Sequence, residues 1–256
     1  MRLLLLSDLH LEFLSKPQKL YAAISPNMAD AVVLAGDIAC GTGAEDVIRY
    51  LVGVGYRVIY VLGNHEFYGH DPEQLIAQWR EISERTPGLY FLHNDAVTLD
   101  GITFWGTVLW SHLNTQRQTE AVDRLLRQNL KRVADFRHIK VWSPKMMQQH
   151  YYQALDYLTR FLHQPTTGRI VVISHFLPSY RCIDTAFAAS PLNPYFASPL
   201  DKLIEQTQPA LWLHGHTHSS VRLSIGQTRI MANPRGYPHL AHELNPQISW
   251  DQVIWL

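Results

Sequence analysis

The chain has 256 residues, with 22 basic and 22 acidic side chains, so its formal net charge at pH 7 is zero. A chain of this length can bury one large core without dividing into two domains. The balanced charge produces no overall field that would attract nucleic acid or an anionic membrane, although nucleic acid is not excluded as a substrate.

The cysteines and the N-terminal segment favour a reducing, cytoplasmic setting. Cys40 and Cys182 are too few for a disulfide framework and lack the C-x-x-C spacing of a redox or zinc site. Four leucines follow Met1 and Arg2, whereas a signal peptide needs an apolar region of about seven residues. No stretch approaches the roughly 18 apolar residues of a membrane span. We therefore expect a cytoplasmic protein with no membrane partner, and the oligomeric state is left open.

Five apolar, β-prone segments are expected to form buried strands, and each stops at polar residues that include Asp, Asn or His. Continuous apolar runs of this length are typical of strands buried on both faces of a sheet. The five segments are residues 3–6, 32–35, 58–62, 170–173 and 211–213. Because chemistry gathers beyond the carboxyl ends of strands in open α/β sheets, we expect the five polar clusters to lie together.

The first part of the chain alternates strands with expected helices, which is typical of a mostly parallel sheet with right-handed crossovers. The expected helices are residues 16–24, 43–52 and 72–85. After residue 90 the pattern changes to two hairpins, 90–99 with 102–110 and 221–225 with 228–232. Together with a last strand near 252–255, these hairpins predict a second sheet packed on the first.

A polar, helical stretch near residues 119–162 is expected to form a helical insertion within a single domain that spans residues 1–256. Its second part, residues 145–162, spaces Met146, Tyr151, Leu155, Leu158 and Leu162 at near-helical intervals, which is typical of a core-facing stripe. Residues 179–199 are rich in Pro, Ser and Ala and show no periodicity. We expect them to form a long loop near the functional site.

The polar clusters supply the ligand types that divalent metal ions need. Hard ions need carboxylate oxygen, borderline ions accept imidazole nitrogen, and a site for two ions needs one bridging ligand. The candidates are two carboxylates, one amide and four imidazoles, namely Asp8, Asp37, Asn64, His10, His175, His216 and His218. Two divalent ions against two carboxylates and one bridging hydroxide would leave a charge of about +1, which favours an anionic phosphate.

The order of these motifs resembles the calcineurin-like metallophosphoesterase superfamily. The chain has D-x-H at Asp8, G-D at Asp37, G-N-H-E at Asn64, a strand that ends before His175, and G-H-x-H at Gly215 to His218. One such motif is a weak signal, whereas five in order across residues 8–218 are specific. The resemblance implies an α/β fold in which two mixed β-sheets form a sandwich flanked by helices. It also implies a hydrolase that acts on phosphoric ester bonds.

The resemblance assigns roles to single residues. One ion would bind Asp8, His10, Asp37 and His218, and the other would bind Asp37, Asn64, His175 and His216, so that Asp37 bridges them. His65 matches the family's non-ligand histidine, which stabilises the transferring phosphoryl group or protonates the leaving oxygen. Asn64 and His65 would also face the substrate. A metal-bound hydroxide would then attack phosphorus in line.

Each residue also has a structural alternative, because a histidine near a strand end commonly forms only structural hydrogen bonds and an aspartate there often caps a helix or forms a turn. Arg235 suits bidentate contact with phosphate, with a turn made by Pro and Gly as its alternative. His214 either supports a metal ligand or is structural, and Glu66 is expected to bond nearby backbone or to orient a ligand.

One departure from the family pattern narrows the choice of branch. The D-R-G that follows G-D in the protein Ser/Thr phosphatases is absent after Asp37. Its absence argues against a protein phosphatase, and it leaves the hydrogen-bond partner of His65 unidentified. The segment from Asn233 to Tyr237, which contains Arg235, resembles a tail of a bacterial branch of the family.

We therefore expect a dinuclear metal-dependent phosphoesterase that hydrolyses a phosphodiester or phosphomonoester of a small molecule. Manganese, iron and zinc all suit these ligands, and the sequence does not choose among them. The missing D-R-G arginine favours a diester. One alternative is a nuclease, which would need a basic groove that the sequence does not indicate. The other is a non-catalytic binding or scaffold module, which would be expected to lack some ligands.

Overall fold

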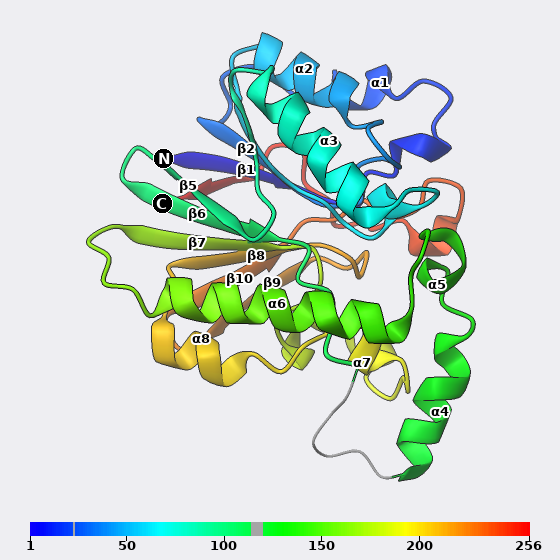
Figure 1. The fold of residues 1–256 in the computed structure, drawn as a ribbon. Coiled ribbons are helices and arrows are strands. Elements are labelled where there is room, and N and C mark those ends of the chain that lie inside the picture. The colour runs from blue at the N-terminus through cyan, green and yellow to red at the C-terminus, as the bar shows by residue number, and fades with distance from the viewer. Residues whose placement is uncertain (23, 114–119) are drawn as a thin grey trace.

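The computed structural model describes residues 1–22, 24–113 and 120–256. Residues 23 and 119, which belong to our expected helical stretches 16–24 and 119–162, lie outside the described residues. Two β-sheets pack face to face, and helices cover the outer face of each sheet (Figure 1). This arrangement confirms the predicted α/β sandwich of mixed sheets flanked by helices.

The first sheet has five strands in the order β11-β1-β2-β3-β4. They are β1 (Arg2–Leu6), β2 (Ala31–Ala35), β3 (Arg57–Val61), β4 (Leu89–Phe91) and β11 (Val253–Trp255). Strands β1 to β4 are parallel, and β11 is antiparallel to β1. Our expectation that the last strand joins the second sheet is wrong, because Ile254 pairs with Leu3 and is buried beside it between the sheets.

The second sheet has six strands in the order β5-β6-β7-β8-β10-β9. They are β5 (Asp95–Leu99), β6 (Ile102–Thr107), β7 (Arg169–Ser174), β8 (Leu211–His214), β9 (Val221–Ile225) and β10 (Thr228–Ala232). Both predicted hairpins are present, as β5 with β6 and β9 with β10. Strands β6, β7, β8 and β10 are parallel, so the sheet is mixed.

The segment 90–99, which we expected to be one strand, is divided between the two sheets. Leu89–Phe91 form β4 beside β3, whereas Asp95–Leu99 form β5 beside β6. The chain turns between them at Asn94, whose φ of 57° lies in the left-handed region that asparagine tolerates. The expectation was wrong because the polar residues His93, Asn94 and Asp95 mark a turn between two strands and not the middle of one.

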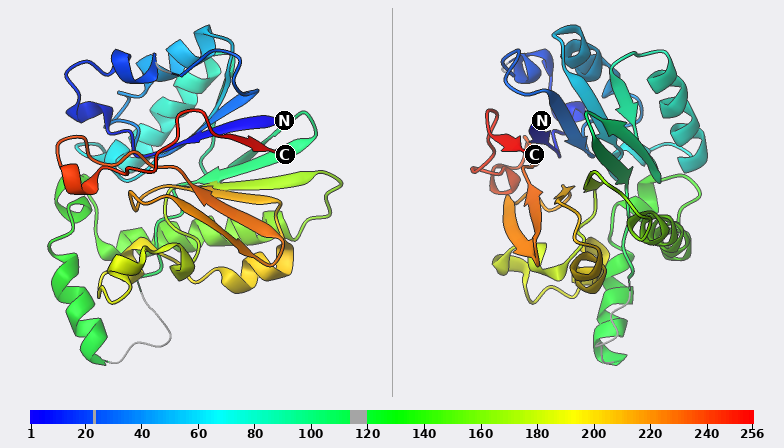
Figure 2. Two further views of the ribbon diagram at one scale, coloured as in Figure 1. Left: turned by 180° about the vertical axis from the view of Figure 1, so that it is seen from behind. Right: turned by 90° about the vertical axis from the view of Figure 1, so that its left-hand side faces the viewer.

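The helices form two outer layers (Figures 1 and 2). Helices α1 (Gln18–Tyr21), α2 (Glu45–Gly53) and α3 (Pro72–Glu84) lie over the first sheet, and α6 (Pro144–Leu162) and α8 (Asp201–Thr207) lie over the second. Helix α1 is shorter than expected, because it begins only after Pro17, whose ring suits a helix start.

Helix α6 begins where its sequence predicts. The Ser143 side chain caps it by accepting a hydrogen bond from the Met146 nitrogen at 3.3 Å. Tyr151, Leu158 and Leu162 are buried as expected, whereas Met146 and Leu155 are only partly buried against the core. The buried face of this helix is therefore rotated slightly from the predicted stripe.

The remaining helices lie near the end of the sandwich opposite the two termini. Helices α4 (Glu120–Leu130) and α5 (Asp135–His138) are on that side in Figure 1 and in the left view of Figure 2. The expected loop 179–199 contains two 3₁₀ turns, Tyr180–Cys182 and Thr185–Phe187, and helix α7 (Asn193–Phe196). None of the described helices combines the length and the apolar composition that crossing a membrane would require.

The core has two parts because the strands are buried on both faces. Alternate residues, such as Leu3 and Val33, face the other sheet, and their neighbours, such as Leu4 and Val32, face the helices. The prediction of buried strands is confirmed, but β1, β2 and β3 belong to one sheet and β7 and β8 to the other. The carboxyl ends of these five strands lie at one end of the sandwich (Figure 1).

Candidate metal centre

All seven predicted ligands lie at the carboxyl ends of the five strands. Asp8, His10, Asp37 and Asn64 follow β1, β2 and β3, and His175, His216 and His218 follow β7 and β8. Six of them are buried, and the side chain of His218 is 14% exposed. The packing of the two sheets therefore brings together residues that are far apart in the chain, such as Asp8 and His216, which 208 positions separate.

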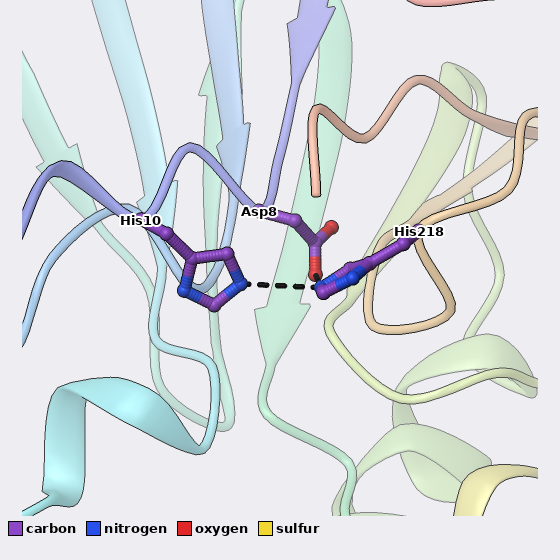
Figure 3. A group of neighbouring side chains, drawn as sticks. All are labelled: Asp8, His10 and His218. Carbon is purple, nitrogen blue, oxygen red and sulfur yellow. Dashed lines mark hydrogen bonds and ion pairs between the residues drawn. The ribbon is translucent and has the colours of Figure 1, made fainter. Parts of the chain in front are cut away.

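The first group consists of Asp8, His10 and His218, each of which offers one ligand atom within 4.8 Å of the others (Figure 3). The Nε2 atoms of His10 and His218 face each other at 3.2 Å, and His218 Nε2 is 3.7 Å from Asp8 Oδ1. Two imidazole lone pairs at this distance repel each other unless a proton or a cation lies between them. This group has the composition and spacing of a cation site.

The second group consists of Asp37, His175 and His216, whose ligand atoms also lie within 4.8 Å of one another. His175 Nε2 is 3.4 Å from Asp37 Oδ1 and 3.1 Å from the side-chain oxygen of Asn64. His216 Nε2 is buried and has no hydrogen-bond partner among the residues that the structure describes. A buried nitrogen without a partner is costly, and a metal ion would satisfy it.

Asp37 lies between the two groups. Its Oδ1 faces His175, and its Oδ2 is 3.9 Å from His10 Nε2. The Asp37 backbone nitrogen donates to Glu66 Oε2 at 3.0 Å, and its Oδ1 accepts from the His65 nitrogen at 2.9 Å. The carboxylate is therefore held with one oxygen toward each group.

The backbone at the ligands adopts an uncommon conformation. Five ligands have φ in the left-handed region, namely Asp8 (52°), His10 (47°), Asp37 (53°), His216 (78°) and His218 (48°). Such a conformation costs on the order of 1–3 kcal/mol for a residue with a side chain, and it persists where the surroundings enforce it. Here the Asp8 nitrogen donates to the Gly36 carbonyl at 3.0 Å, and the His10 nitrogen donates to the Asp37 carbonyl at 3.1 Å.

Two motif glycines are required by close packing against the ligands. A Cβ at Gly63 would lie 2.5 Å from the Asp37 backbone nitrogen and closer still to its Oδ1. A Cβ at Gly215 would lie 2.6 Å from Asp8 Oδ2. A glycine is therefore required in G-N-H-E and in G-H-x-H, because the space beside each carboxylate admits a hydrogen atom but not a Cβ.

Asp135 on α5 orients the Asn64 side chain, and the sequence offered no signal for it. The Nδ2 of Asn64 donates to Asp135 Oδ1 at 2.9 Å, which leaves the amide oxygen of Asn64 facing His175. The hydroxyls of Tyr68 and Tyr195 also donate to Asp135, at 2.8 and 2.6 Å. Burial raises the pKa of this carboxyl, and the three donors oppose that rise.

Glu66 bonds nearby backbone, as predicted. Its carboxylate accepts hydrogen bonds from the nitrogens of Ile38 and Gly63, both at 2.7 Å, and from the Tyr60 hydroxyl at 2.9 Å. With the bond from Asp37, these contacts tie the loop after β2 to the loop after β3. Burial raises the pKa of Glu66 to about 7.

His65 has two hydrogen-bond partners that the sequence did not identify. Its Nδ1 is 3.2 Å from Glu12 Oε1, and its Nε2 is 2.7 Å from the Tyr237 hydroxyl. Burial by itself would lower the pKa of His65, but Asp37, Cys40 and Glu12 beside it raise the pKa to about 11. The available signal for Glu12 was its place two residues after the histidine of D-x-H.

The charges in the centre suit metal ligation. Burial by itself would raise the pKa of Asp37, but His175 and His65 hold it well below its usual range. Burial lowers the pKa of His216 well below its ordinary value and that of His218 to about 3. His216 and His218 are therefore neutral, which is the state in which an imidazole donates a lone pair to a metal ion. Burial by itself would lower the pKa of His175, but Asp37 and Asp8 raise it to about 9, so His175 would release a proton on binding a metal ion.

Two further candidates make contacts with backbone. Arg235 donates from Nη1 to the Leu9 carbonyl at 2.9 Å, so it lies beside the loop that carries Asp8 and His10. The Nδ1 of His214 is 3.0 Å from the Gly215 carbonyl oxygen, and its Nε2 is buried without a partner among the described residues. The contact of His214 favours its structural alternative, and the role of Arg235 toward phosphate stays a prediction.

The sequence model of the calcineurin-like phosphoesterases matches residues 1–220, which include all seven candidate ligands and His65. The chain belongs to the calcineurin-like phosphoesterase family. This membership confirms the predicted resemblance and makes the protein a metallophosphoesterase, a hydrolase that acts on phosphoric ester bonds. The clustered His and Asp side chains could hold the divalent ions that such enzymes bind.

Individual proteins resemble this phosphoesterase in sequence or in fold. The chain is 24% identical over 271 aligned positions to the uncharacterized protein L509 of Acanthamoeba polyphaga mimivirus, covering 97% of this chain and 96% of the relative. The phosphopantetheinyl hydrolase of Mycobacterium tuberculosis has a TM-score of 0.69 at 17% identity, covering 96% of this chain and 97% of that one. Protein TT1561 of Thermus thermophilus has a TM-score of 0.54 at 16% identity, covering 91% and 88%. These structures share the fold of this phosphoesterase.

Proposed function

We propose that this phosphoesterase is a dinuclear metal-dependent enzyme that hydrolyses a phosphodiester or phosphomonoester of a small molecule. The position of Asp37 carries the proposal. One carboxylate oxygen faces His175 at 3.4 Å and the other faces His10 at 3.9 Å, and these histidines belong to separate groups. A carboxylate in this position is suited to bridge two ions.

The donor set fits two divalent ions. Asp8, His10 and His218 would hold one ion, Asn64, His175 and His216 would hold the other, and Asp37 would contact both. Manganese, iron or zinc would each suit this mixture of oxygen and imidazole ligands. When bound, two such ions supply Lewis-acid stabilisation of the phosphoryl oxygens and a hydroxide nucleophile at neutral pH.

His65 is proposed as the catalytic acid or phosphoryl-stabilising group. Its raised pKa favours the protonated ring, and Glu12 accepts from the Nδ1 side. The Nε2 side meets the Tyr237 hydroxyl, which a substrate oxygen would replace. A protonated imidazole held in this way can stabilise charge on the phosphoryl group or donate a proton to the leaving oxygen.

Substrate contacts are proposed for Asn64, His65 and Arg235. Arg235 donates one of its five N–H groups to the Leu9 carbonyl, and its planar guanidinium can also donate to a phosphate oxygen. We favour a diester, because the chain lacks the D-R-G arginine of the protein phosphatases. The cytoplasmic location and the description of residues 119–162 as an insertion stay predictions.

The test compares two aryl phosphate esters. Protein stripped of metal and reloaded with Mn²⁺ is assayed with a bis-aryl phosphodiester and with the matching aryl monoester. We expect turnover only after reloading, with the diester preferred. His65→Ala should lower kcat by about 10²–10⁴-fold, whereas His163→Ala, on an exposed histidine after α6, should not change it.

The outcomes separate the alternatives. Preference for the monoester would keep the enzyme assignment and redirect the search to phosphatase substrates. If both ions bind but neither ester is hydrolysed, the non-catalytic binding module becomes the better interpretation. Turnover that is equal in His65→Ala would remove His65 from the mechanism.

A further inference from the structure

A further group of potential metal ligands shares His65 with the phosphoesterase centre. Glu12, Cys40 and His65 each offer one ligand atom within 4.8 Å of the others. Glu12 and Cys40 are not among the proposed ligands of the two catalytic ions. This group combines a carboxylate, a thiol and an imidazole, whereas the proposed catalytic ligands include no sulfur.

The spacing suits a tetrahedral ion. Zinc lies about 2.0–2.3 Å from oxygen, nitrogen and sulfur ligands, which separates the ligand atoms of a tetrahedral site by about 3.3–3.8 Å. Glu12 Oε1 and His65 Nδ1 are already 3.2 Å apart. Small movements of side chains would therefore complete three corners of a tetrahedron, with water at the fourth.

Neighbouring contacts orient two of the three ligands. The Tyr237 hydroxyl meets His65 Nε2 at 2.7 Å, so Nδ1 is the nitrogen that faces Glu12. The Glu12 carboxylate also contacts His10 Nδ1 at 3.2 Å. Such outer contacts hold a ligand set in place before the ion arrives.

An open cavity of about 140 Å³ leads to this group. Glu12 and Cys40 line it, together with Leu11, Tyr21 and Asp46. The Cys40 residue is partly exposed, and the side chain of Glu12 is 17% exposed. A hydrated ion can therefore reach the thiol without passing through the phosphoesterase centre.

The acidic side chains around Cys40 disfavour a free thiolate and favour a bound cation. Burial raises the pKa of the Cys40 thiol, and the carboxylates of Glu12 and Glu66 raise it further, against the opposing effect of His65. The thiol therefore keeps its proton until a cation displaces it. Glu12 and a Cys40 thiolate would together neutralise one divalent ion.

We propose that Glu12, Cys40 and His65 form an inhibitory site for one thiophilic divalent cation such as Zn²⁺ or Cd²⁺. The cation displaces two protons to water, one from the Cys40 thiol and one from His65 Nδ1, and bonds to both atoms. The bond to Nδ1 removes His65 from the acid role described above, and this inhibitory consequence rests on the proposed function. The binding itself does not.

Binding is tested without any assay of turnover. Mn²⁺-loaded protein is titrated with Cd²⁺, and the ultraviolet charge-transfer absorption of the cadmium–thiolate bond is recorded. The sequence contains only two cysteines, and Cys182 is buried and 2% exposed. We expect absorption equivalent to one thiolate in the parent and in Cys182→Ser, and its loss in Cys40→Ser. Glu12→Gln should weaken Cd²⁺ binding by at least about tenfold.

Absorption that survives in Cys40→Ser, or that never develops in the parent, would overturn the site. If the site is correct, Cd²⁺ should inhibit ester hydrolysis by the parent at concentrations that leave Cys40→Ser active. Equal inhibition of the parent and of Cys40→Ser would overturn the inhibitory role. The absorption measurement would still decide whether Cd²⁺ binds at Cys40. Failure of the proposed function would instead appear as absent turnover before any Cd²⁺ is added.

Discussion

Asp135 accepts a hydrogen bond of 2.9 Å from the side-chain nitrogen of Asn64, although 71 positions separate them in the chain. A carboxylate can only accept at this position, so it selects the Asn64 rotamer whose oxygen faces His175. Two tyrosine hydroxyls fix the carboxylate in turn. The helix α5, which carries none of the family motifs, thus orients a candidate metal ligand.

Replacement of Asp135 by Asn should weaken metal binding. The new amide can donate as well as accept, so the Asn64 amide is no longer held with its oxygen toward the centre. Loss of such an outer partner typically costs 10–100-fold in metal affinity, and we expect about that effect from chelator competition with Mn²⁺. Asp156→Asn, on the exposed face of α6, is the matched control. Equal affinities in both variants would contradict the orienting role.

Asp37→Ala should lower the metal content of the protein, whereas His65→Ala should leave it unchanged. The first variant loses the carboxylate that faces both groups, so elemental analysis should find both ions reduced and activity abolished. The second loses no proposed ligand, so it should keep both ions and lose most turnover. Full metal content in Asp37→Ala would rule out the bridging assignment.

Arg235→Ala should raise KM more than it lowers kcat. The guanidinium is expected to bind phosphate in the ground state and in the transition state alike, and loss of such uniform binding appears in KM. Steady-state kinetics with the preferred ester measure the split, and Arg160→Ala on the surface of α6 is the control. Unchanged kinetics would favour the alternative in which this segment is only a turn.

Gly63→Ala should destabilise the metal-free protein. The added Cβ would meet the Asp37 backbone, which cannot move aside without disturbing the β2 loop. Overpacking of this kind costs about 1–3 kcal/mol in the free energy of unfolding, as measured by urea denaturation. Gly53→Ala, in α2 with no atom within 4 Å of its new Cβ, should be neutral or stabilising. Similar stabilities of the two variants would show that the Gly63 site can relax.

His214 should make the metal-free protein less stable as the pH falls. Burial lowers its pKa in the folded state to about 4, from an ordinary value of 6.5. Between these values the unfolded chain binds a proton that the folded chain does not, so the free energy of unfolding decreases as the pH drops from about 6.5 to about 4. The full effect is about 3 kcal/mol.

The contribution of His214 is isolated by comparing urea unfolding across this pH range in the parent and in His214→Gln. The variant should show a shallower pH dependence, because its side chain does not titrate. His163→Gln removes an exposed histidine and should leave the slope of the parent. Identical slopes in all three proteins would mean that His214 is not held neutral by the fold.

The candidate ligands could be predicted because each is adjacent in sequence to the strand that positions it. Asp8 follows β1 and His175 follows β7, so an apolar run and the polar residues after it indicate both the strand and the site. The ligands then lie near one another because parallel strands have their carboxyl ends at the same edge of a sheet. The helix α6 and both hairpins were also visible, because periodicity and turn residues are local signals.

The choice of sheet for each strand depended on the tertiary structure. Strands β4 and β5 follow each other closely in the chain yet join different sheets, and β11 returns to pair with β1. The sheet that a strand joins depends on which neighbouring strand has an unpaired edge and on which side chains fill the layer between the sheets. A local sequence pattern contains neither kind of information.

The sequence by itself determined the metal-binding motifs and the family, because those side chains sit at set distances from their own strands. Only the tertiary structure supplied Glu12, Tyr237 and Asp135 as partners of the motif residues. Glu12 contacts His65 across 53 positions, and Tyr237 contacts it across 172. Hydrogen bonds of this kind depend on which loops the packing of the two sheets brings together. The periodicity of the sequence does not predict such contacts.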